Sequence, residues 1–287
     1  MSDNKKAIIA ILLGTLIGSA SATVVKMGVK DMPPFTFTFL RFFIASLCII
    51  PFFLHRRFDK KTLTQLILLS LLATGNIVLF SFGVALTTAT IGQLLYAGVP
   101  IITAFVIFLL FKESLPTMKS IGIIIGFLGV GIIVLLPVLE KGQLFAGNLL
   151  GNMLIGLGVI LYSFYMVYSK KLLKMQSPFV ITSMFIFTTT IAVLPFFLGE
   201  LSVRWWEHMT VTTVLTITYA SIGATILTYI LNQYAIKHGG AVLASVGFYL
   251  LPVFSTMVAF LFLDERLIAG IIIGGSIALF GSYLVMK

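Results

Sequence analysis

Charged side chains are scarce in this chain of 287 residues, where Asp, Glu, Lys and Arg together make up 10%. A soluble domain usually carries about 25% charged residues. With hydrophobic residues at 59%, the chain could not keep its surface in water, so a water-soluble globular protein is excluded. The remaining solvent is lipid, in which a backbone must form helices or a closed barrel.

Cysteine and the usual catalytic constellations are also missing. The single cysteine, Cys48, excludes an internal disulfide. The sequence shows no Ser-His-Asp spacing, no cluster of metal ligands and no phosphate-binding loop. The few ionisable side chains leave little acid–base chemistry. We therefore expect no enzyme activity, no metal ion and no cofactor.

Long apolar runs are what the chain does contain. They are continuous rather than alternating, so they predict helices and not barrel strands. Ten of them reach the length of about 20 residues that a spanning helix needs. The predicted spans are Ala7–Val25, Phe35–Leu54, Leu63–Leu86, Ala89–Phe111, Ser120–Leu139, Leu149–Ser169, Phe179–Leu198, Val211–Leu231, Gly239–Leu263 and Leu267–Met286. The short loops between them leave no room for a soluble domain.

The two halves of the chain repeat each other. Gly14 matches Gly158, 144 positions later, and the stretch 51–54 reads the same as 195–198. Towards the end of each half the offset becomes 152, as when Pro100 matches Pro252. Residues 1–144 and 145–287 are therefore predicted to be two copies of one unit with five spans each.

An odd number of spans per copy makes the second copy enter the membrane from the opposite face. The predicted fold is thus an all-α integral membrane protein, with ten transmembrane helices in two inverted five-helix repeats. Inverted repeats are typical of secondary transporters that work by alternating access. The alternative is that the duplication only stabilises a membrane bundle.

Basic residues predict the orientation. Thirteen of the nineteen Lys and Arg residues fall on the side of the two termini, five fall on the other side, and Arg41 lies within a span. Cytoplasmic loops hold the excess of Lys and Arg, so both termini are expected in the cytoplasm, with the chain in the inner or plasma membrane. This bias accounts for the net charge of +10, so no nucleic-acid partner is predicted.

Several short motifs occur in a fixed order in both halves. They are Pro33-Pro34-Phe35, Leu40-Arg41-Phe42, Pro100 with Glu113 and Leu115, and Pro252 with Glu265 and Leu267, with a glycine-rich helix after each of the last two. In this order the chain resembles the EamA-type proteins of the drug/metabolite transporter superfamily along its whole length. The resemblance implies a carrier of small metabolites, often an exporter of amino acids or related compounds. Many members carry a Trp near the first helix's Gly-Ser stretch, which here is Gly18-Ser19 without one.

The positions of the carboxylates bear on the energy source. All nine, and all three histidines, fall at the ends of predicted spans or in loops. Proton-coupled pumps usually keep an ionisable side chain inside the bilayer. We therefore expect an exporter driven by the gradient of its own substrate. An importer of the same fold and a proton-coupled multidrug exporter are the alternatives.

The substrate pocket is predicted to consist of uncharged polar and aromatic side chains. Buried amides and hydroxyls need partners in lipid, so they should face inward and line a cavity, although bonding between helices is the alternative. Such a wall suits a neutral or zwitterionic metabolite with an apolar part, or a cation held by ring faces. The candidates are Asn76, Phe80, Gln93, Tyr96, Tyr162, Tyr165, Thr225, Tyr229, Asn232, Ser245, Phe248 and Tyr249.

Three charges receive a structural role. Arg41 lies about a third of the way along the second span, where a charge costs several kcal/mol unless it is paired or hydrated. We favour snorkelling or capping of backbone carbonyls over binding an anionic group of the substrate. Glu113 and Glu265, at the ends of spans four and nine, are assigned as structural charges as well.

Proline and glycine suggest where helices bend and pack. Pro100 and Pro252 are predicted to break spans four and nine near mid-depth because proline removes a backbone hydrogen bond. They are candidate gating hinges, with a static kink as the alternative. Glycine stripes on spans five and ten, which include Gly122 and Gly274, predict close helix packing. We favour packing within a monomer, with a homodimer as the alternative.

Overall fold

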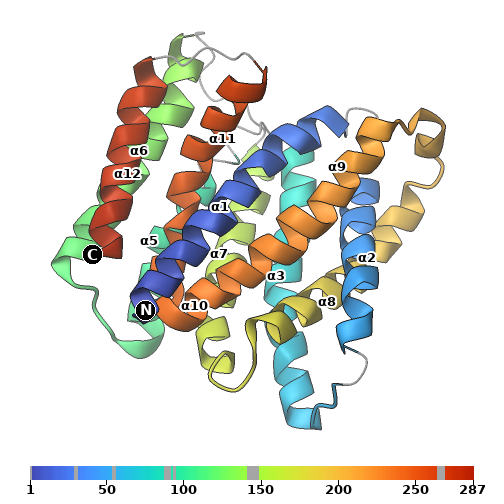
Figure 1. The fold of residues 1–287 in the computed structure, drawn as a ribbon, viewed down its shortest axis with the longest axis horizontal. Coiled ribbons are helices and arrows are strands. Elements are labelled where there is room, and N and C mark those ends of the chain that lie inside the picture. The colour runs from blue at the N-terminus through green and yellow to red at the C-terminus, as the bar shows by residue number, and fades with distance from the viewer. Residues whose placement is uncertain are drawn as a thin grey trace.

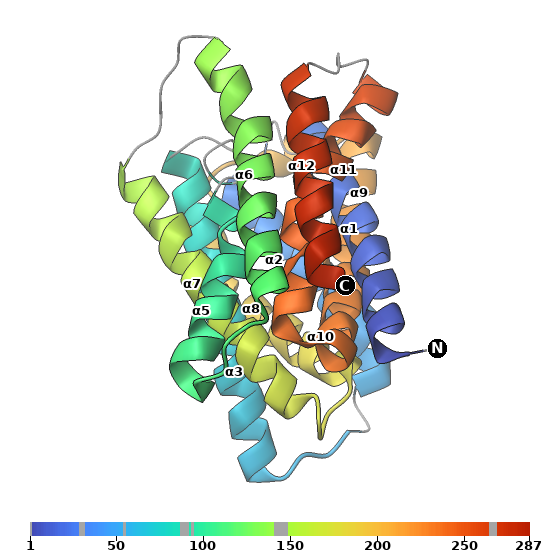
Figure 2. The same cartoon turned by 90° about the vertical axis from the view of Figure 1, so that its left-hand side faces the viewer.

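The computed structural model describes residues 2–28, 32–53, 56–86, 92, 95–140, 149–263 and 269–287, and these parts are helical with short connections (Figures 1 and 2). The helices are α1 (Asp3–Gly28), α2 (Pro34–Phe53), α3 (Lys60–Leu86), α5 (Val99–Phe111), α6 (Thr117–Glu140), α7 (Leu149–Leu172), α8 (Pro178–Gly199), the 3-10 helix η1 (Trp205–His208), α9 (Val211–Ser221), the π-helix η2 (Ile222–Leu227), α10 (Thr228–Ser245), α11 (Gly247–Leu263) and α12 (Ala269–Met286).

Five helical stretches in the described residues are long and apolar enough to cross a membrane. One of them, Val211–Ser245, joins α9, η2 and α10, so these three elements form a single span. The predicted end of this span at Leu231 is wrong, because helix α10 continues past it. The chain turns instead at Gly240, whose φ of 86° glycine adopts readily. The ninth span begins after this turn.

The two repeats interlock instead of lying side by side. Helix α1 packs along α10, and its repeat equivalent α7 packs along α3. The equivalent helices α2 and α8 contact each other, as do α6 and α12. A pseudo-two-fold axis therefore passes between the members of each pair. Ser46 Oγ and Thr190 Oγ1, which stand 144 positions apart, lie 2.9 Å from each other across it.

Glycine makes the contact between α6 and α12 possible. A Cβ atom at Gly129 would lie 2.3 Å from the backbone nitrogen of Ala278, and one at Gly281 would lie 2.3 Å from that of Gly126. The two backbones thus touch where a side chain would hold them apart. The glycine stripes of spans five and ten face each other within one chain.

Two carboxylates cap the starts of helices. Glu200, at the end of α8, accepts hydrogen bonds from the backbone nitrogens of Phe35 (3.3 Å) and Thr36 (2.6 Å), so it ties the start of α2 to α8. Asp59 precedes α3 and accepts a bond from the Thr62 nitrogen at 3.2 Å. The hydrogen bonds from Thr62 hold the pKa of Asp59 below its usual value.

Candidate functional site

Aromatic rings from both repeats meet in the middle of the helix bundle. Tyr96, just before α5, lies edge-on to Phe80 of α3, with ring centroids 5.4 Å apart. It also lies 5.8 Å from Phe248 of α11. Phe248 is in turn 5.6 Å from Tyr162 of α7. These four predicted pocket residues are therefore neighbours, although the chain separates them by up to 168 positions (248 minus 80).

The same row of rings continues towards α8 and α10. Tyr162 lies 5.7 Å from Tyr165, and Tyr165 lies 5.9 Å from Phe185 of α8. Phe185 contacts Tyr229 of α10 at 4.7 Å and Phe42 of α2 at 5.5 Å. We call the eight rings the ring cluster. Phe42 and Phe185 were not predicted, because a phenylalanine in an apolar helix carries no signal of its own.

Asn76 attaches the third span to the fourth. Its Nδ2 donates to the hydroxyl of Tyr96 at 2.5 Å, and its side chain is buried among α3 and α7. Gly158 of α7 allows this placement, because a Cβ there would lie only 3.2 Å from the Asn76 amide nitrogen. Two of the predicted residues are thus joined by a direct hydrogen bond.

Buried polar atoms near the cluster lack partners. Among the described residues, the Oδ1 atom of Asn232 is buried without a hydrogen bond. The Tyr165 hydroxyl makes no bond of standard geometry, but Gln233 and Ser169 lie close enough to interact with it. The Oε1 atom of Gln233 is also without one, while its Nε2 donates to Ser169 Oγ at 3.3 Å. Such atoms are uncommon in native structures, and a ligand or ordered water is the usual explanation. Sequence reasoning missed Gln233, although an amide inside an apolar span was a visible signal.

Arg41 reaches from α2 to the π-helix η2. Its Nε donates to Thr225 Oγ1, and its Nη2 donates to the carbonyl oxygen of Ala224 at 3.1 Å. The Thr225 hydroxyl donates in turn to the Ala220 carbonyl at 2.7 Å. A π-helix changes the bonding of the carbonyls around it, and Arg41 and Thr225 bond to the carbonyls of Ala224 in η2 and Ala220 near the end of α9. Thr225 is fully buried by these contacts.

Two predicted pocket residues lie elsewhere. Tyr249 donates its hydroxyl to the Ile123 carbonyl at 2.8 Å, and its ring covers Gly126, where a Cβ would lie 2.5 Å away. It therefore packs α11 against α6, and its assignment to the pocket is corrected. The hydroxyl of Ser245 donates to the Val242 carbonyl one turn earlier at 2.7 Å. This bond occupies its only donor proton within its own helix.

The prolines differ from the prediction in one respect. Leu95 and Tyr96 are helical, the chain turns at 97–98, and Pro100 is the second residue of α5, so the fourth span is interrupted just before Pro100 and not at it. Proline is well tolerated there because the first helical residues lack intrahelical partners for their N–H groups. Pro252 does lie inside α11, and the nearest break is at Val246.

The remaining predicted residues can be placed briefly. Glu113 is exposed in the connection between α5 and α6. Gln93 and Glu265 lie outside the described residues. Trp205 and Trp206 form η1 in the connection before α9, with ring centroids 5.7 Å apart.

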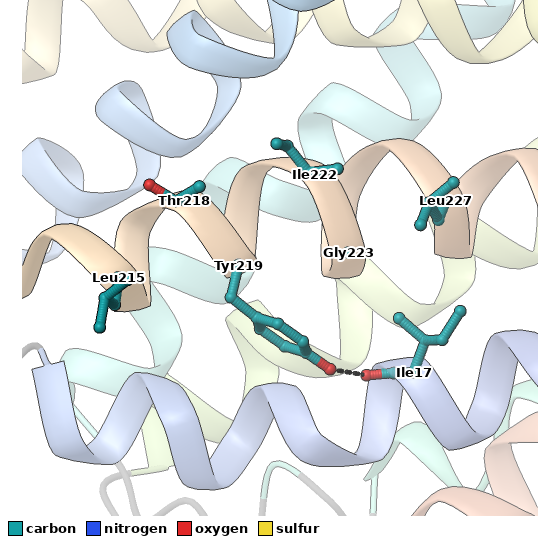
Figure 3. Close-up of a pocket in the computed structure, with 7 residues that line it drawn as sticks. All are labelled: Ile17, Leu215, Thr218, Tyr219, Ile222, Gly223 and Leu227. Carbon is teal, nitrogen blue, oxygen red and sulfur yellow. Dashed lines mark hydrogen bonds between the residues drawn. The ribbon is translucent and has the colours of Figure 1, made fainter. Parts of the chain in front are cut away.

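A separate groove of about 440 Å³ lies between α1 and the α9–η2 stretch (Figure 3). Its lining is almost wholly apolar, and its one tyrosine, Tyr219, donates its hydroxyl to the Ile17 carbonyl at 2.6 Å. Few polar groups remain to orient a solute, whereas pockets usually fix ligands with a few placed polar groups. The ring cluster is therefore the better candidate for the functional site.

Interlocked, duplicated helices that are long and apolar enough to cross a membrane define a multi-pass membrane protein. The chain belongs to the EamA-like transporter family, which matches residues 5–135 and 149–287, once in each repeat. The protein is thus a multi-pass carrier with a small-molecule substrate, and the family is one of transporters and not of enzymes.

Curated relatives agree with this assignment. An uncharacterized transporter of Archaeoglobus fulgidus is 29% identical over 98% of this chain and 97% of the relative. An uncharacterized transporter of Clostridium kluyveri is 26% identical over 98% and 93% of the two chains. A Salmonella typhimurium protein named "Probable amino-acid metabolite efflux pump" is 26% identical over 76% and 74%. A solved crystal structure with 17% identity superimposes with a TM-score of 0.81, covering 98% of this chain and 97% of that one, and shows the same fold.

Proposed function

We propose that the protein exports a small organic metabolite, an amino acid or a related compound, by alternating access. The family supplies the transporter class. The name of the Salmonella relative supports an amino-acid metabolite and outward transport. Repeats that open to opposite faces suit a carrier whose site lies between them.

One observation carries the proposal. The ring cluster draws on both repeats, and unpaired polar atoms, among them Asn232 Oδ1, lie buried on its helices. Rings provide a surface for an apolar side chain, while the unpaired atoms offer hydrogen bonds to a polar end. A metabolite of that kind would satisfy both.

The carboxylates that the structure describes support a carrier driven by its own substrate. Asp3, Glu113 and Glu200 stand at helix ends or in connections. Proton relays usually place such groups within the bilayer. This favours the proposal over a proton-coupled multidrug exporter. An importer of the same fold differs only in the direction of net flux, and transport assays on oriented vesicles distinguish the two.

The direct test is counterflow of radiolabelled L-amino acids in proteoliposomes. Tyr229→Phe should weaken transport several-fold, because a buried hydrogen bond contributes about 1 kcal/mol, and the folded yield should not change. Tyr283→Phe, on the exposed side of α12, is the matched control. Gln93→Ala should behave like Tyr229→Phe. Wild-type transport rates in both pocket variants would show that these residues do not bind the substrate. Absence of counterflow with every amino acid would refute the substrate class.

We further propose that the repeats meet between residues 144 and 145, and that both termini face the cytoplasm of a monomeric carrier in the cell membrane. The two family matches end and begin on either side of that boundary. A reporter that works only outside the membrane, fused after Lys287, should stay silent. Activity of the reporter would place the termini on the outer side instead. Transport should also continue when an uncoupler abolishes the proton gradient.

A further inference from the structure

Arg41 brings a positive charge into the membrane without a counter-ion. It stands seven positions after Pro34 at the start of α2, which places it about 10 Å along the helix. Among the described residues, no carboxylate lies within ion-pair distance of its guanidinium, and its nearest partners are neutral. Charges at this depth are rare and usually mark functional sites.

The hydrogen bonds of Arg41 use only one edge of the guanidinium. Nε and Nη2 form its side edge, and both bond to η2. Nη1 has no partner within the described parts of the chain. The end edge, formed by Nη1 and the second proton of Nη2, is therefore not bonded to any described residue, and two parallel N–H bonds point from it. Because the side edge is anchored, the free edge is held in one direction.

The guanidinium of Arg41 lies next to the ring cluster. The guanidinium carbon is 5.5 Å from the ring centroid of Phe42, which contacts Phe185. Phe185 contacts Tyr229, with ring centroids 4.7 Å apart. The residue one turn before Tyr229 is Thr225, the anchor of Arg41. The charge thus stands at the α10 end of the row of rings.

We propose that the free edge of Arg41 binds a carboxylate of the transported solute through two parallel hydrogen bonds. Guanidinium and carboxylate match in this bidentate geometry, and the anion supplies the missing counter-charge. The inference rests on the proposed function and narrows it: the solute carries a carboxylate beside an apolar part that the rings cover. An amine without a carboxylate is disfavoured, because Arg41 repels it.

Matched acid and amide pairs test this directly. Purified full-length protein is titrated with benzoate and benzamide, and with L-phenylalanine and L-phenylalaninamide, at constant chloride. Calorimetry and thermal shift measure binding. Each acid should bind at least about tenfold more tightly than its amide, the factor expected for a hydrogen bond to a charged group.

Variants separate the charge from its anchor. Arg41→Gln should abolish the preference for the acid, whereas Arg41→Lys should retain part of it as a point charge without the fork. Thr225→Val keeps the charge but removes one of the two bonds that hold the side edge, so it should reduce acid binding by a smaller factor. Arg56→Gln, at an exposed arginine between α2 and α3, controls for net charge and should change nothing.

The outcomes are distinct. Wild-type protein that binds amides as well as acids, or that binds none of the acids, overturns the inference, as does an unchanged preference in Arg41→Gln. If Arg41→Gln does not fold, an unchanged preference in both Arg41→Lys and Thr225→Val overturns it. Counterflow of an amino acid and its amide at equal rates refutes the inference alone. Absence of all amino-acid counterflow refutes the proposed function.

Discussion

The third span of each repeat occupies an equivalent place but is built differently. Helix α3 is a continuous α-helix, whereas its counterpart changes to the π-helix η2 between α9 and α10. Asn76 and the equivalent Thr228, 152 positions later, show the consequence. Asn76 donates to Tyr96 of the next span, while Thr228, the first residue of α10, donates back to the Gly223 carbonyl of η2 at 3.0 Å. The two spans therefore pack in equivalent places, but their equivalent polar side chains have different hydrogen-bond partners.

Charge differs between the repeats in the same way. Arg41 of α2 binds to η2, but the residue 144 positions later is Phe185, so the equivalent position on α8 carries no charge. One end of the ring cluster is therefore cationic and the other is closed by the neutral pair of Asn76 and Tyr96. Equivalent helices can thus present different chemistry to one solute.

Packing at α3 gives the largest expected effect. A Cβ at Gly83 would lie 2.5 Å from Ile155 Cγ1 and 2.8 Å from the Gly151 carbonyl, whereas the equivalent Ala235 on α10 already has a buried Cβ. Gly83→Ala should lower the free energy of unfolding by about 1–3 kcal/mol through overpacking. Denaturation in detergent measures this. Gly156→Ala, where no atom lies within 4 Å, is the control, and equal stability of the two variants would contradict the close contact.

The π-helix gives the next effect. Thr225→Val removes the hydroxyl that links Arg41 to the Ala220 carbonyl and leaves two buried groups with fewer partners. The free energy of unfolding should fall by about 1–3 kcal/mol. Thr74→Val on the uninterrupted α3, which loses one bond to Thr189, should cost less. An equal loss in both would show that η2 is no more dependent on its hydroxyls than an ordinary helix.

Substitutions at Asn76 and at Thr228 should have different effects on the transport rate. Asn76→Ala frees the Tyr96 hydroxyl and should reduce counterflow several-fold, since one buried hydrogen bond is lost beside the rings. Thr228→Ala removes a bond that stays within one helix and should leave the rate nearly unchanged. The measurement is the initial rate of counterflow of each variant, normalised to the amount of folded protein. The reverse order would place the solute nearer to η2 than to Tyr96.

The smallest effect lies on the pseudo-two-fold axis. Ser46 and Thr190 come from equivalent positions and bond to each other. A double-mutant cycle with Ser46→Ala and Thr190→Ala should give a coupling energy of about 0.6 kcal/mol, the average for hydroxyl pairs between membrane helices. No coupling would mean that the two hydroxyls do not share a bond in the membrane.

Much of the site could be predicted because of what lipid demands. Polar and aromatic side chains inside apolar spans must turn inward, and this places Asn76 beside Tyr96 and Phe248 beside Tyr162. Tyr249 shows the limit of the argument. It is as polar as its neighbours, but one residue further round the helix it meets Gly126 and not the rings. Periodicity predicts which residues turn inward, and it does not tell which interior surface each of them faces.

The sequence by itself determined the membrane class, the ten spans, the duplication and the inversion, because hydropathy, repeat spacing and an odd span count are properties of the chain alone. Only the tertiary structure decided the partners across long separations. These include Glu200 capping α2, Ser46 meeting Thr190, and Arg41 lying on a π-helix 184 residues away. A hydrogen bond between distant residues depends on helix rotation, depth and rotamer together, and no local pattern of residues records those three at once.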